Sequence, residues 1–222
     1  MQTNLPRLCR RIGYEFKTLA FLKQALTHRS ASNKNNERFE FLGDSILSMV
    51  ISHALFERFP DENEGQLSRL RAHLVKGEML ASIAVELELG DYLYLGQGEL
   101  KSGGFRRAST LADALEAVFA AIYFDGGLSA AQDVILKLFH SRLNDPDLHD
   151  TLKDPKTQLQ EYLQSKKLPL PEYTLANVLG EEHEQIFYVQ CHVPGLNKST
   201  QGHAETRRKA EQIAAKQLLK IL

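Results

Sequence analysis

The spacing of apolar residues changes partway along this 222-residue chain, and this change limits the folds open to it. Between residues 37 and 143, apolar residues recur every three or four positions, which is the period of a helix with one buried face. After residue 172 they alternate with polar residues, as in a half-buried strand. A polar stretch with two prolines, residues 144–156, lies between the two patterns. The sequence therefore predicts an all-α domain over residues 1–147, a linker over 148–153 and a small α+β domain over 154–222.

Helices account for nearly all of the first predicted domain. A helix over residues 37–56 carries an apolar stripe made by Phe39, Leu42, Ile46, Met49, Val50 and His53. The helical pattern continues over residues 67–89. Residues 109–124 are apolar on nearly every side, which indicates a central buried helix that ends at Gly126 and Gly127. The glycine-rich stretch 96–104 predicts a loop.

The second predicted domain has the element order α-β-β-β-α. Helices are expected over residues 155–166 and 205–222, and strands over 173–179, 185–193 and 196–201. The buried side of the last helix is predicted to consist of Ala210, Ile213, Ala214, Leu218 and Ile221.

Composition limits the class of protein. Hydrophobic residues make up 43% of the chain and charged residues 25%, which are values of an ordinary globular protein. The two cysteines, Cys9 and Cys191, lie far apart in no paired motif, which argues against a disulfide framework and a cysteine-based zinc site. The apolar run 117–124 is too short to span a bilayer, which needs about 20 apolar residues. We therefore expect a soluble, cytoplasmic protein without a membrane partner.

Two sets of acidic residues lie on strongly apolar helical segments. Glu37, Glu40 and Asp44 share one face of the first helix, and Asp113 and Glu116 lie three residues apart on the most apolar one. Lysine and arginine are absent from residues 39–57 and 108–136, so no cation nearby in sequence can neutralise these carboxylates. A Mg²⁺ ion can, because it prefers oxygen ligands. The alternative is that these acids are solvated helix charges, and Glu64, in a polar loop, is expected to be solvated.

The last helix begins with a run of cations, Arg207 to Lys209, after Thr206. The positive end of the helix dipole makes these cations unfavourable unless an anion binds there, and phosphate is the obvious candidate. The alternative is a solvated basic helix end. One polar face of the first helix of this domain, predicted over residues 155–166, carries uncharged and acidic groups that suit ribose hydroxyls. These are Thr157, Gln160, Glu161 and Gln164.

Several segments carry distinctive motifs. The first domain contains THRS at 27–30, NERFEFLGDS at 36–45, EGQLSRLRA at 64–72 and LADALEA at 111–117. Together these resemble the ribonuclease III signature. The second domain contains DPKTQLQEYLQ at 154–164, HEQIFYV at 183–189 and GHAETRRKAEQIAA at 202–215, which resemble a double-stranded-RNA-binding domain. The resemblance covers nearly the whole chain, in the domain order of the bacterial enzymes.

The resemblance implies an enzyme and its site. It implies a Mg²⁺-dependent homodimeric endonuclease, with Mn²⁺ as a substitute, that cuts double-stranded RNA to staggered 5′-phosphate and 3′-hydroxyl ends. It also implies processing of ribosomal RNA precursors and some messenger RNAs. By motif, the metal ligands would be Glu40, Asp44, Asp113 and Glu116. Asp44 and Glu116 would be the catalytic pair, Glu37 and Glu64 would have supporting roles, and Phe41 would pack into the other subunit.

The resemblance also assigns RNA contacts to the second domain. The minor groove would be touched by Thr157, Gln160, Glu161, Gln164 and His183. Arg207 and Arg208 would bind phosphates. Glu211 stands where many such domains have a third cation, which predicts a modest RNA affinity.

Two alternatives remain open from the residues. One is a duplex-RNA binder that does not cleave, although such a protein has no need for the full carboxylate set. The other is a structural protein stabilised by Ca²⁺ or Mg²⁺, which would leave the basic helix start unexplained. For an enzyme, water is the expected nucleophile, because no serine, cysteine or histidine constellation accompanies the carboxylates. His28 is expected to have no direct catalytic role, and His53 is expected to be packed.

Overall fold

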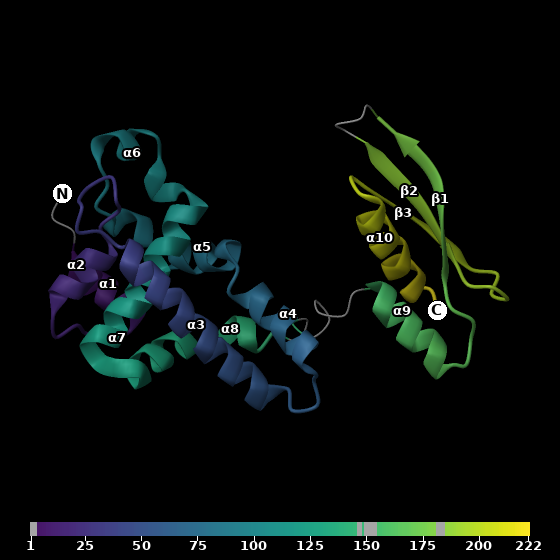
Figure 1. The fold of residues 1–222 in the computed structure, drawn as a ribbon, viewed down its shortest axis with the longest axis horizontal. Helices are drawn as coiled ribbons and strands as arrows, with labels where there is room; N and C mark the ends of the chain where they lie inside the picture. The colour runs from purple at the N-terminus through teal and green to yellow at the C-terminus, as the bar shows by residue number, and fades with distance from the viewer. Residues whose placement is uncertain (1–3, 146–147, 149–154, 181–184) are drawn as a thin grey trace. The chain divides into compact units, whose positions relative to one another are not determined.

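The chain forms two compact units, Met1–Leu148 and His149–Leu222. The structure is a computed structural model, and it describes residues 4–145, 148, 155–180 and 185–222 (Figure 1). Most of the predicted linker lies outside the described residues, so its bounds stay a prediction. The predicted fold class, a helical unit followed by a small α+β unit, is confirmed.

The first unit consists of helices and connecting loops. Its elements are α1 (Leu5–Ile12), α2 (Leu19–Ala25), α3 (Glu37–Arg58), α4 (Glu64–Leu74), α5 (Gly77–Glu86), the 3₁₀ helix η1 (Leu89–Tyr92), α6 (Gln97–Lys101), the 3₁₀ helix η2 (Gly104–Arg106), α7 (Ala108–Leu138) and α8 (His140–Leu143). Among the described residues of this unit the only strand-like pairing is an isolated bridge between Thr27 and Tyr94.

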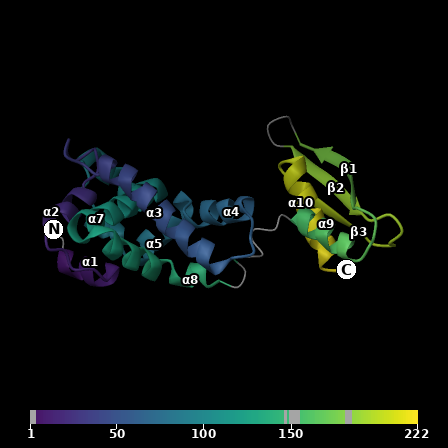
Figure 2. The same cartoon turned by 60° about the horizontal axis from the view of Figure 1, so that its bottom comes forward.

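The centre of this unit is α7, as its apolar sequence predicts. All six side chains from Ala117 to Ile122 are fully buried. The helical path is interrupted at Gly127, which has a φ of 80°, a conformation that favours glycine, and this agrees with the predicted end of the central helix. Figures 1 and 2 both show α3 running alongside α7, and α2 and α5 also pack on α7.

Three expectations for this unit are wrong in detail. The predicted continuous helical stretch 67–89 is divided into α4 and α5, because the chain leaves the helix at Val75 and Lys76. The predicted loop 96–104 contains the short helix α6. The sequence places His53 and Met49 in the buried stripe of α3, but both are exposed. The buried face is rotated away from them and includes Leu47, Ile51 and Leu55.

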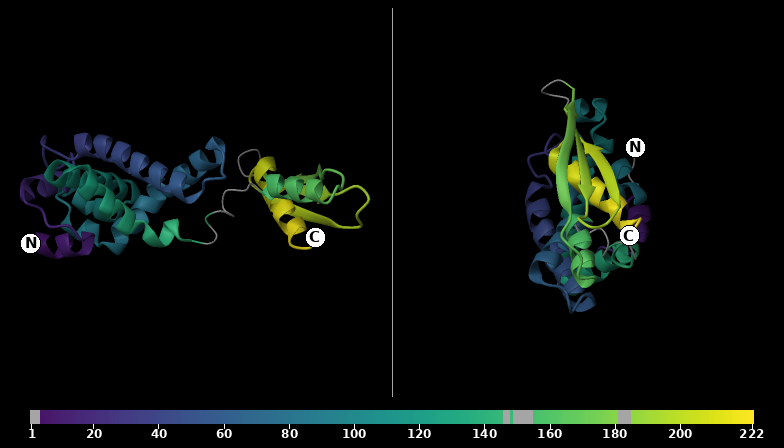
Figure 3. Two further views of the ribbon diagram at one scale, coloured as in Figure 1. Left: turned by 90° about the horizontal axis from the view of Figure 1, so that it is seen from below. Right: turned by 90° about the vertical axis from the view of Figure 1, so that its right-hand side faces the viewer.

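The second unit has a three-stranded antiparallel sheet with the order β1-β2-β3, formed by β1 (Glu172–Leu179), β2 (Ile186–His192) and β3 (Ser199–Ala204). The helices α9 (Pro155–Ser165) and α10 (Arg207–Leu219) pack against each other on one face of this sheet (Figure 3). Their shared core includes Leu159, Leu163, Cys191, Val193, Ala214 and Leu218. Glycine is needed at position 202, because a Cβ there would lie 2.2 Å from the Ala210 carbonyl oxygen of α10.

Two expectations for this unit need correction. The third strand lies at Ser199–Ala204 and not at 196–201, because Val193 to Leu196 form a turn. Ala210, Ala214 and Leu218 are buried on α10 as predicted, but Ile213 and Ile221 are 38% and 47% exposed. Residue 213 lies at the margin of the buried face, and residue 221 lies beyond the end of the helix.

Length and composition alone would allow α3 and α7 to cross a membrane. This is weak evidence, since the core helix of a soluble protein passes the same test, and half of the apolar window of α7 is buried within the protein.

Candidate functional site

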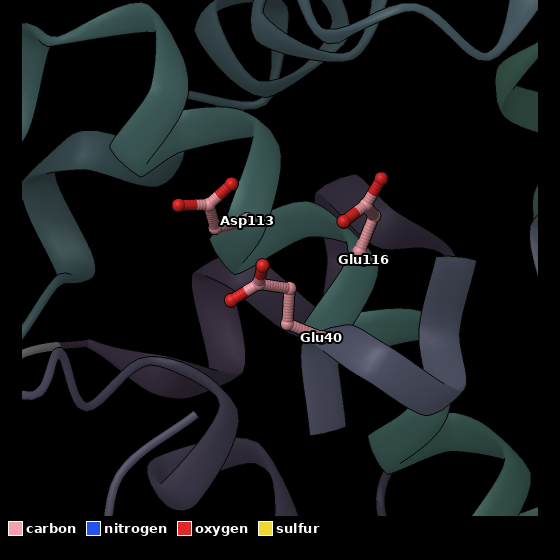
Figure 4. A group of neighbouring side chains, drawn as sticks. All are labelled: Glu40, Asp113 and Glu116. Carbon is pink, nitrogen blue, oxygen red and sulfur yellow. The ribbon is translucent and has the colours of Figure 1, made fainter. Parts of the chain in front are cut away.

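Three of the predicted metal ligands meet where α3 crosses α7. Glu40 comes from α3, and Asp113 and Glu116 come from successive turns of α7. One carboxylate oxygen from each lies within 4.8 Å of the others. Figure 4 shows Glu40 pointing toward Asp113, with Glu116 further along α7. Residues more than 70 positions apart in the sequence thus form one acidic cluster, called the carboxylate cluster below.

Gly43 allows this meeting. A Cβ at residue 43 would lie 1.8 Å from the backbone oxygen of Glu116, a distance that no real side chain tolerates. This glycine, two turns into α3, therefore lets the backbones of the two helices approach closely, at the position that places Glu40 beside Glu116. This explains a residue that otherwise weakens a helix by about 1 kcal/mol relative to alanine.

The carboxylate cluster is half-buried, and its charges disfavour one another. Burial raises the pKa of Glu116 to about 8, and the charges of Asp44, Glu40 and Asp113 contribute to that rise in the same direction. Burial is also the main cause that raises the pKa of Glu40, followed by the charge of Asp113. The pKa of Asp113 is raised by burial, while His28 and Arg29 oppose that shift. Three acids with raised pKa values in one place indicate a missing positive charge.

The chemistry of the cluster fits a hard divalent cation. Mg²⁺ and Mn²⁺ prefer carboxylate oxygens, and Mg²⁺ usually keeps several waters beside one or two carboxylates. Within the described part of the chain, no lysine, arginine or histidine forms an ion pair with Glu40, Asp113 or Glu116. A bound cation would therefore supply the direct compensation that no ion pair within the described residues provides.

The fourth predicted ligand, Asp44, lies outside the group of three. It is exposed and sits one helical turn after Glu40 on α3. Its charge is nevertheless the largest of the three that raise the pKa of Glu116, so it lies within electrostatic reach of the cluster. Glu37 is also exposed, and its carboxylate pairs with Arg29 at 3.4 Å.

The loop that contains the THRS motif places His28 and Arg29 where their charges partly offset the rise in the pKa of Asp113 that burial causes. The sequence of the loop does not reveal this role. His28 Nδ1 lies 2.8 Å from Ser30 Oγ, and that hydroxyl accepts a hydrogen bond of 2.9 Å from the backbone N–H of Gly96. These contacts hold the loop so that His28 and Arg29 act on Asp113. The signal that could have found them is their position: a histidine and an arginine shortly before the acidic helix.

Glu64 and Phe41 lie on exposed surfaces. Glu64 is the first residue of α4, not a loop residue, and its carboxylate accepts a hydrogen bond from Ser68 Oγ at 2.7 Å. The Phe41 side chain is 78% exposed. It borders a cavity of about 620 Å³ that is lined by Gln24, Glu37, Arg38, Phe39, Phe41, Leu42 and Phe124.

The second unit presents the predicted RNA-contacting residues on exposed surfaces. Leu159 and Leu163 face the core from α9, which leaves an exposed face that carries Thr157, Gln160, Glu161 and Gln164. Arg207 and Arg208 are exposed in the first turn of α10, after the capping hydroxyl of Thr206, which accepts a hydrogen bond from the Lys209 N–H. His183 lies outside the described residues.

Comparison with known families divides the chain in the same order. The family described as "Ribonuclease-III-like" matches residues 19–143, and the family described as "Double-stranded RNA binding motif" matches residues 155–222. The first match contains the carboxylate cluster, and the second contains α9, the sheet and α10.

Full-length relatives agree with these matches. The chain is 64% identical over 222 residues to "Ribonuclease 3" of Legionella pneumophila (strain Lens), covering 100% of this chain and 99% of the relative. It is 58% identical over 219 residues to "Ribonuclease 3" of Shewanella baltica (strain OS185), covering 99% of this chain and 97% of the relative.

A solved structure resembles the first unit. The nuclease domain of ribonuclease III from Campylobacter jejuni is 40% identical to this chain, with a TM-score of 0.63, and the match covers 66% of this chain and all of that domain. A second structure of that nuclease domain, 42% identical with a TM-score of 0.61, covers 62% of this chain and 97% of that one. These matches show that the chain belongs to the ribonuclease III family of endoribonucleases that act on double-stranded RNA.

Proposed function

We propose that this chain cleaves double-stranded RNA by hydrolysis that depends on Mg²⁺, with Mn²⁺ as a substitute, at the carboxylate cluster and Asp44. The observation that carries the proposal is the half-buried meeting of Glu40, Asp113 and Glu116, none of which forms an ion pair with a cation among the described residues. A negatively charged RNA would be repelled by such a site, and a divalent cation would offset most of its negative charge and place a positive ion where a phosphate can bind.

We propose a separate role for each group of carboxylates. When bound, the cation supplies Lewis acidity and a water that is easier to deprotonate. Glu40 of α3 and Asp113 and Glu116 of α7 would hold this cation. Asp44 is proposed as the fourth member and, with Glu116, as the catalytic pair, since its charge acts on Glu116. Glu37 and Glu64 are proposed to support substrate contact from the exposed ends of α3 and α4.

The products proposed for this reaction are 5′-phosphate and 3′-hydroxyl ends with a staggered overhang. Water is the proposed nucleophile, so the ribose 2′-hydroxyl does not attack the phosphate and no cyclic phosphate forms. The cellular role proposed from family membership is the cytoplasmic processing of ribosomal RNA precursors and some messenger RNAs.

The second unit is proposed to bind the RNA duplex by its shape. The exposed face of α9 would contact the minor groove, and Arg207 and Arg208 would bind phosphates across the intervening major groove. The positive start of α10 and its exposed N–H groups favour such an anion. Residues 148–153 are proposed as the linker between the two units.

We propose that two copies of the chain form a homodimer through the surface around Phe41. A phenylalanine that is 78% exposed, beside a cavity lined in part by Phe39, Leu42 and Phe124, is unfavourable in water, and a second copy could cover both. The related nuclease domain of Campylobacter jejuni has a "region involved in dimer formation", which supports the proposal.

One experiment tests the proposed reaction. A duplex RNA labelled at one 5′ end is incubated with the protein and Mg²⁺, in parallel with excess EDTA and with the unpaired single strand. We expect defined fragments only from the duplex with Mg²⁺, and we expect the new 5′ ends to accept radiolabel from kinase only after phosphatase treatment. Binding without cleavage in Mg²⁺ would favour a duplex-RNA binder, and 2′,3′-cyclic phosphate products would contradict the proposed nucleophile.

A further inference from the structure

Glu211 connects the two helices of the second unit through its carboxylate. Its Oε2 accepts a hydrogen bond of 2.6 Å from the Lys156 ammonium at the start of α9. Its Oε1 accepts one of 3.0 Å from Arg207 Nε, one turn earlier on α10. One carboxylate thus holds a cation from each of the two helices that face the proposed RNA.

Lys156 makes two further contacts besides its ion pair with Glu211. The Lys156 ammonium lies 4.3 Å from the centre of the Tyr173 ring on β1. The Lys156 backbone N–H donates to Gln212 Oε1, next to Glu211, at 3.2 Å. These contacts fix the beginning of α9 against α10, directly before Thr157, the first of the residues assigned to the minor groove.

Burial distinguishes Glu211 from an ordinary surface acid. Its side chain is 14% exposed, whereas the side chains of Arg207 and Lys156 are 57% and 33% exposed. Burial alone would raise the pKa of Glu211, but hydrogen bonds from Lys156 and Arg207 outweigh it and lower that pKa. The carboxylate therefore stays charged and is directed toward its two partners rather than toward solvent.

This arrangement changes the meaning of an acid at position 211. The sequence alone suggests that Glu211 weakens RNA binding, because it replaces a cation and repels phosphate. In the structure its charge is taken up by two cations, and it anchors Arg207 at Nε, while the terminal nitrogens of an arginine remain the groups best placed to bind phosphate in pairs.

We infer that Glu211 is a positioning residue for RNA binding, which holds Arg207 in its phosphate-binding orientation and keeps the start of α9 in register with α10. The inference rests on the proposed contact between Arg207 and phosphate. Register matters because a domain of this type contacts two minor grooves and the phosphates between them at once, so both helices must match the duplex together. Removing the negative charge of Glu211 therefore weakens binding, although simple repulsion predicts the opposite.

A double-mutant cycle on the full chain tests this inference. The binding of a fluorescent duplex of about 20 base pairs is measured in EDTA, so that the RNA stays intact, for the wild type, Glu211→Gln, Arg207→Ala and the double variant. We expect Glu211→Gln to raise the Kd by about threefold to tenfold, and to have much less effect when Arg207 is already alanine.

Glu205→Gln is the matched control. Glu205 lies just before α10, and its exposed carboxylate pairs with Lys209 at 3.2 Å without joining the two helices. The same loss of charge there should leave the Kd unchanged or lower it. Glu211→Asp keeps the charge but shortens the side chain, so it should also weaken binding. Circular dichroism of each variant verifies that the second unit is folded, and Glu211→Asp keeps the test open if Glu211→Gln unfolds.

The outcomes separate the inference from the proposed function. Wild-type or tighter binding by Glu211→Gln, or wild-type binding by Glu211→Asp, would overturn the inference. Purely additive effects of Glu211→Gln and Arg207→Ala would overturn the claim that Glu211 acts by holding Arg207, because the Lys156 contact alone would then explain the weaker binding. If Arg207→Ala alone leaves the Kd unchanged, the proposed phosphate contact fails, and the inference fails with it.

Discussion

At the scale of single residues, Glu116 is the carboxyl whose charge the metal-free site disfavours most clearly. Its carboxyl is half-buried beside Glu40 and Asp113, and its pKa is raised to about 8. In the unfolded chain the same group ionises near 4.5. When folding raises the pKa of a group, the contribution of that group to stability is fully present only below its pKa in the unfolded chain. This contribution is lost as the pH rises through its pKa in the folded protein. The site that binds the cation thus weakens the metal-free protein.

Glu116→Gln should therefore stabilise the metal-free protein while it ends catalysis. At pH 8 in EDTA we expect a gain of about 1–3 kcal/mol in the free energy of unfolding, because solvent screens part of the charge. Below about pH 4.5 the gain should disappear. Urea titrations at several pH values measure this. Asp133→Asn, an exposed change on the same helix, is the control. A destabilised Glu116→Gln protein at pH 8 would contradict this description of the cluster.

Asp125 makes a second prediction at this scale. Its carboxylate accepts hydrogen bonds from Tyr14 Oη at 2.9 Å and from the backbone N–H groups of Lys17 and Thr18, both at 2.8 Å. Burial would raise the pKa of Asp125, but these bonds lower it, so its contribution is present above the unfolded pKa and is lost as the pH falls through the folded one. The bonds tie the segment before α2 to α7.

Asp125→Asn should cost about 1–3 kcal/mol of unfolding free energy at pH 7 and less at an acidic pH at which the Asp125 carboxyl is protonated. Chemical denaturation at both pH values measures the difference. Tyr14→Phe removes only one of the three bonds and should have a smaller effect. Equal losses for Asp125→Asn at both pH values would show that the charge is not what matters.

At the scale of elements, the crossing of α3 and α7 determines the site. Gly43→Ala places a methyl group on the backbone oxygen of Glu116, so the two helices must separate. We expect a loss of about 1–3 kcal/mol in stability and a weaker response of cleavage to Mg²⁺, because Glu40 moves away from Glu116. Gly77→Ala is the matched control, since nothing lies within 4 Å of a Cβ at the start of α5. Unchanged stability and Mg²⁺ dependence in Gly43→Ala would refute this role.

The elements also show what the sequence could predict. The order α-β-β-β-α and the long helices α3 and α7 follow from periods of two and about 3.6, which long segments reveal clearly. The break between α4 and α5 and the short α6 depend on only a few residues, so periodicity does not detect them. The start of β3 depends on the preceding turn and on the close contact of Gly202 with α10.

For the candidate site, too, the sequence predicted some features and could not predict others. Residue type and spacing predicted the acids, because carboxylates on apolar helices need compensation. That Glu40, Asp113 and Glu116 meet while Asp44 lies outside the group depends on the crossing of two helices, which one sequence does not display. The role of Glu211 could not be predicted for the same reason: Lys156 lies 55 residues away in the sequence.

At the scale of the whole molecule, the proposed homodimer makes a prediction about assembly. Phe41→Ala removes the exposed ring beside the cavity formed with Phe39 and Phe124. We expect the dimer to dissociate at protein concentrations at which the wild type stays dimeric, by about tenfold or more in Kd, as expected for an aromatic anchor. Sedimentation velocity measures this. Leu100→Ala, which changes another exposed apolar residue in the same unit, is the control. Equal dissociation constants for Phe41→Ala and the wild type would place the interface elsewhere.

Cation binding provides the sharpest test of the carboxylate cluster. Mn²⁺ can be counted by the loss of its free-ion electron paramagnetic resonance signal when it binds to the protein. We predict that the wild type binds Mn²⁺, that Glu40→Gln, Asp113→Asn and Glu116→Gln each weaken this binding at least tenfold, and that Asp133→Asn does not. Unchanged Mn²⁺ affinity and stoichiometry in all three cluster variants would contradict the claim that Glu40, Asp113 and Glu116 form one cation site.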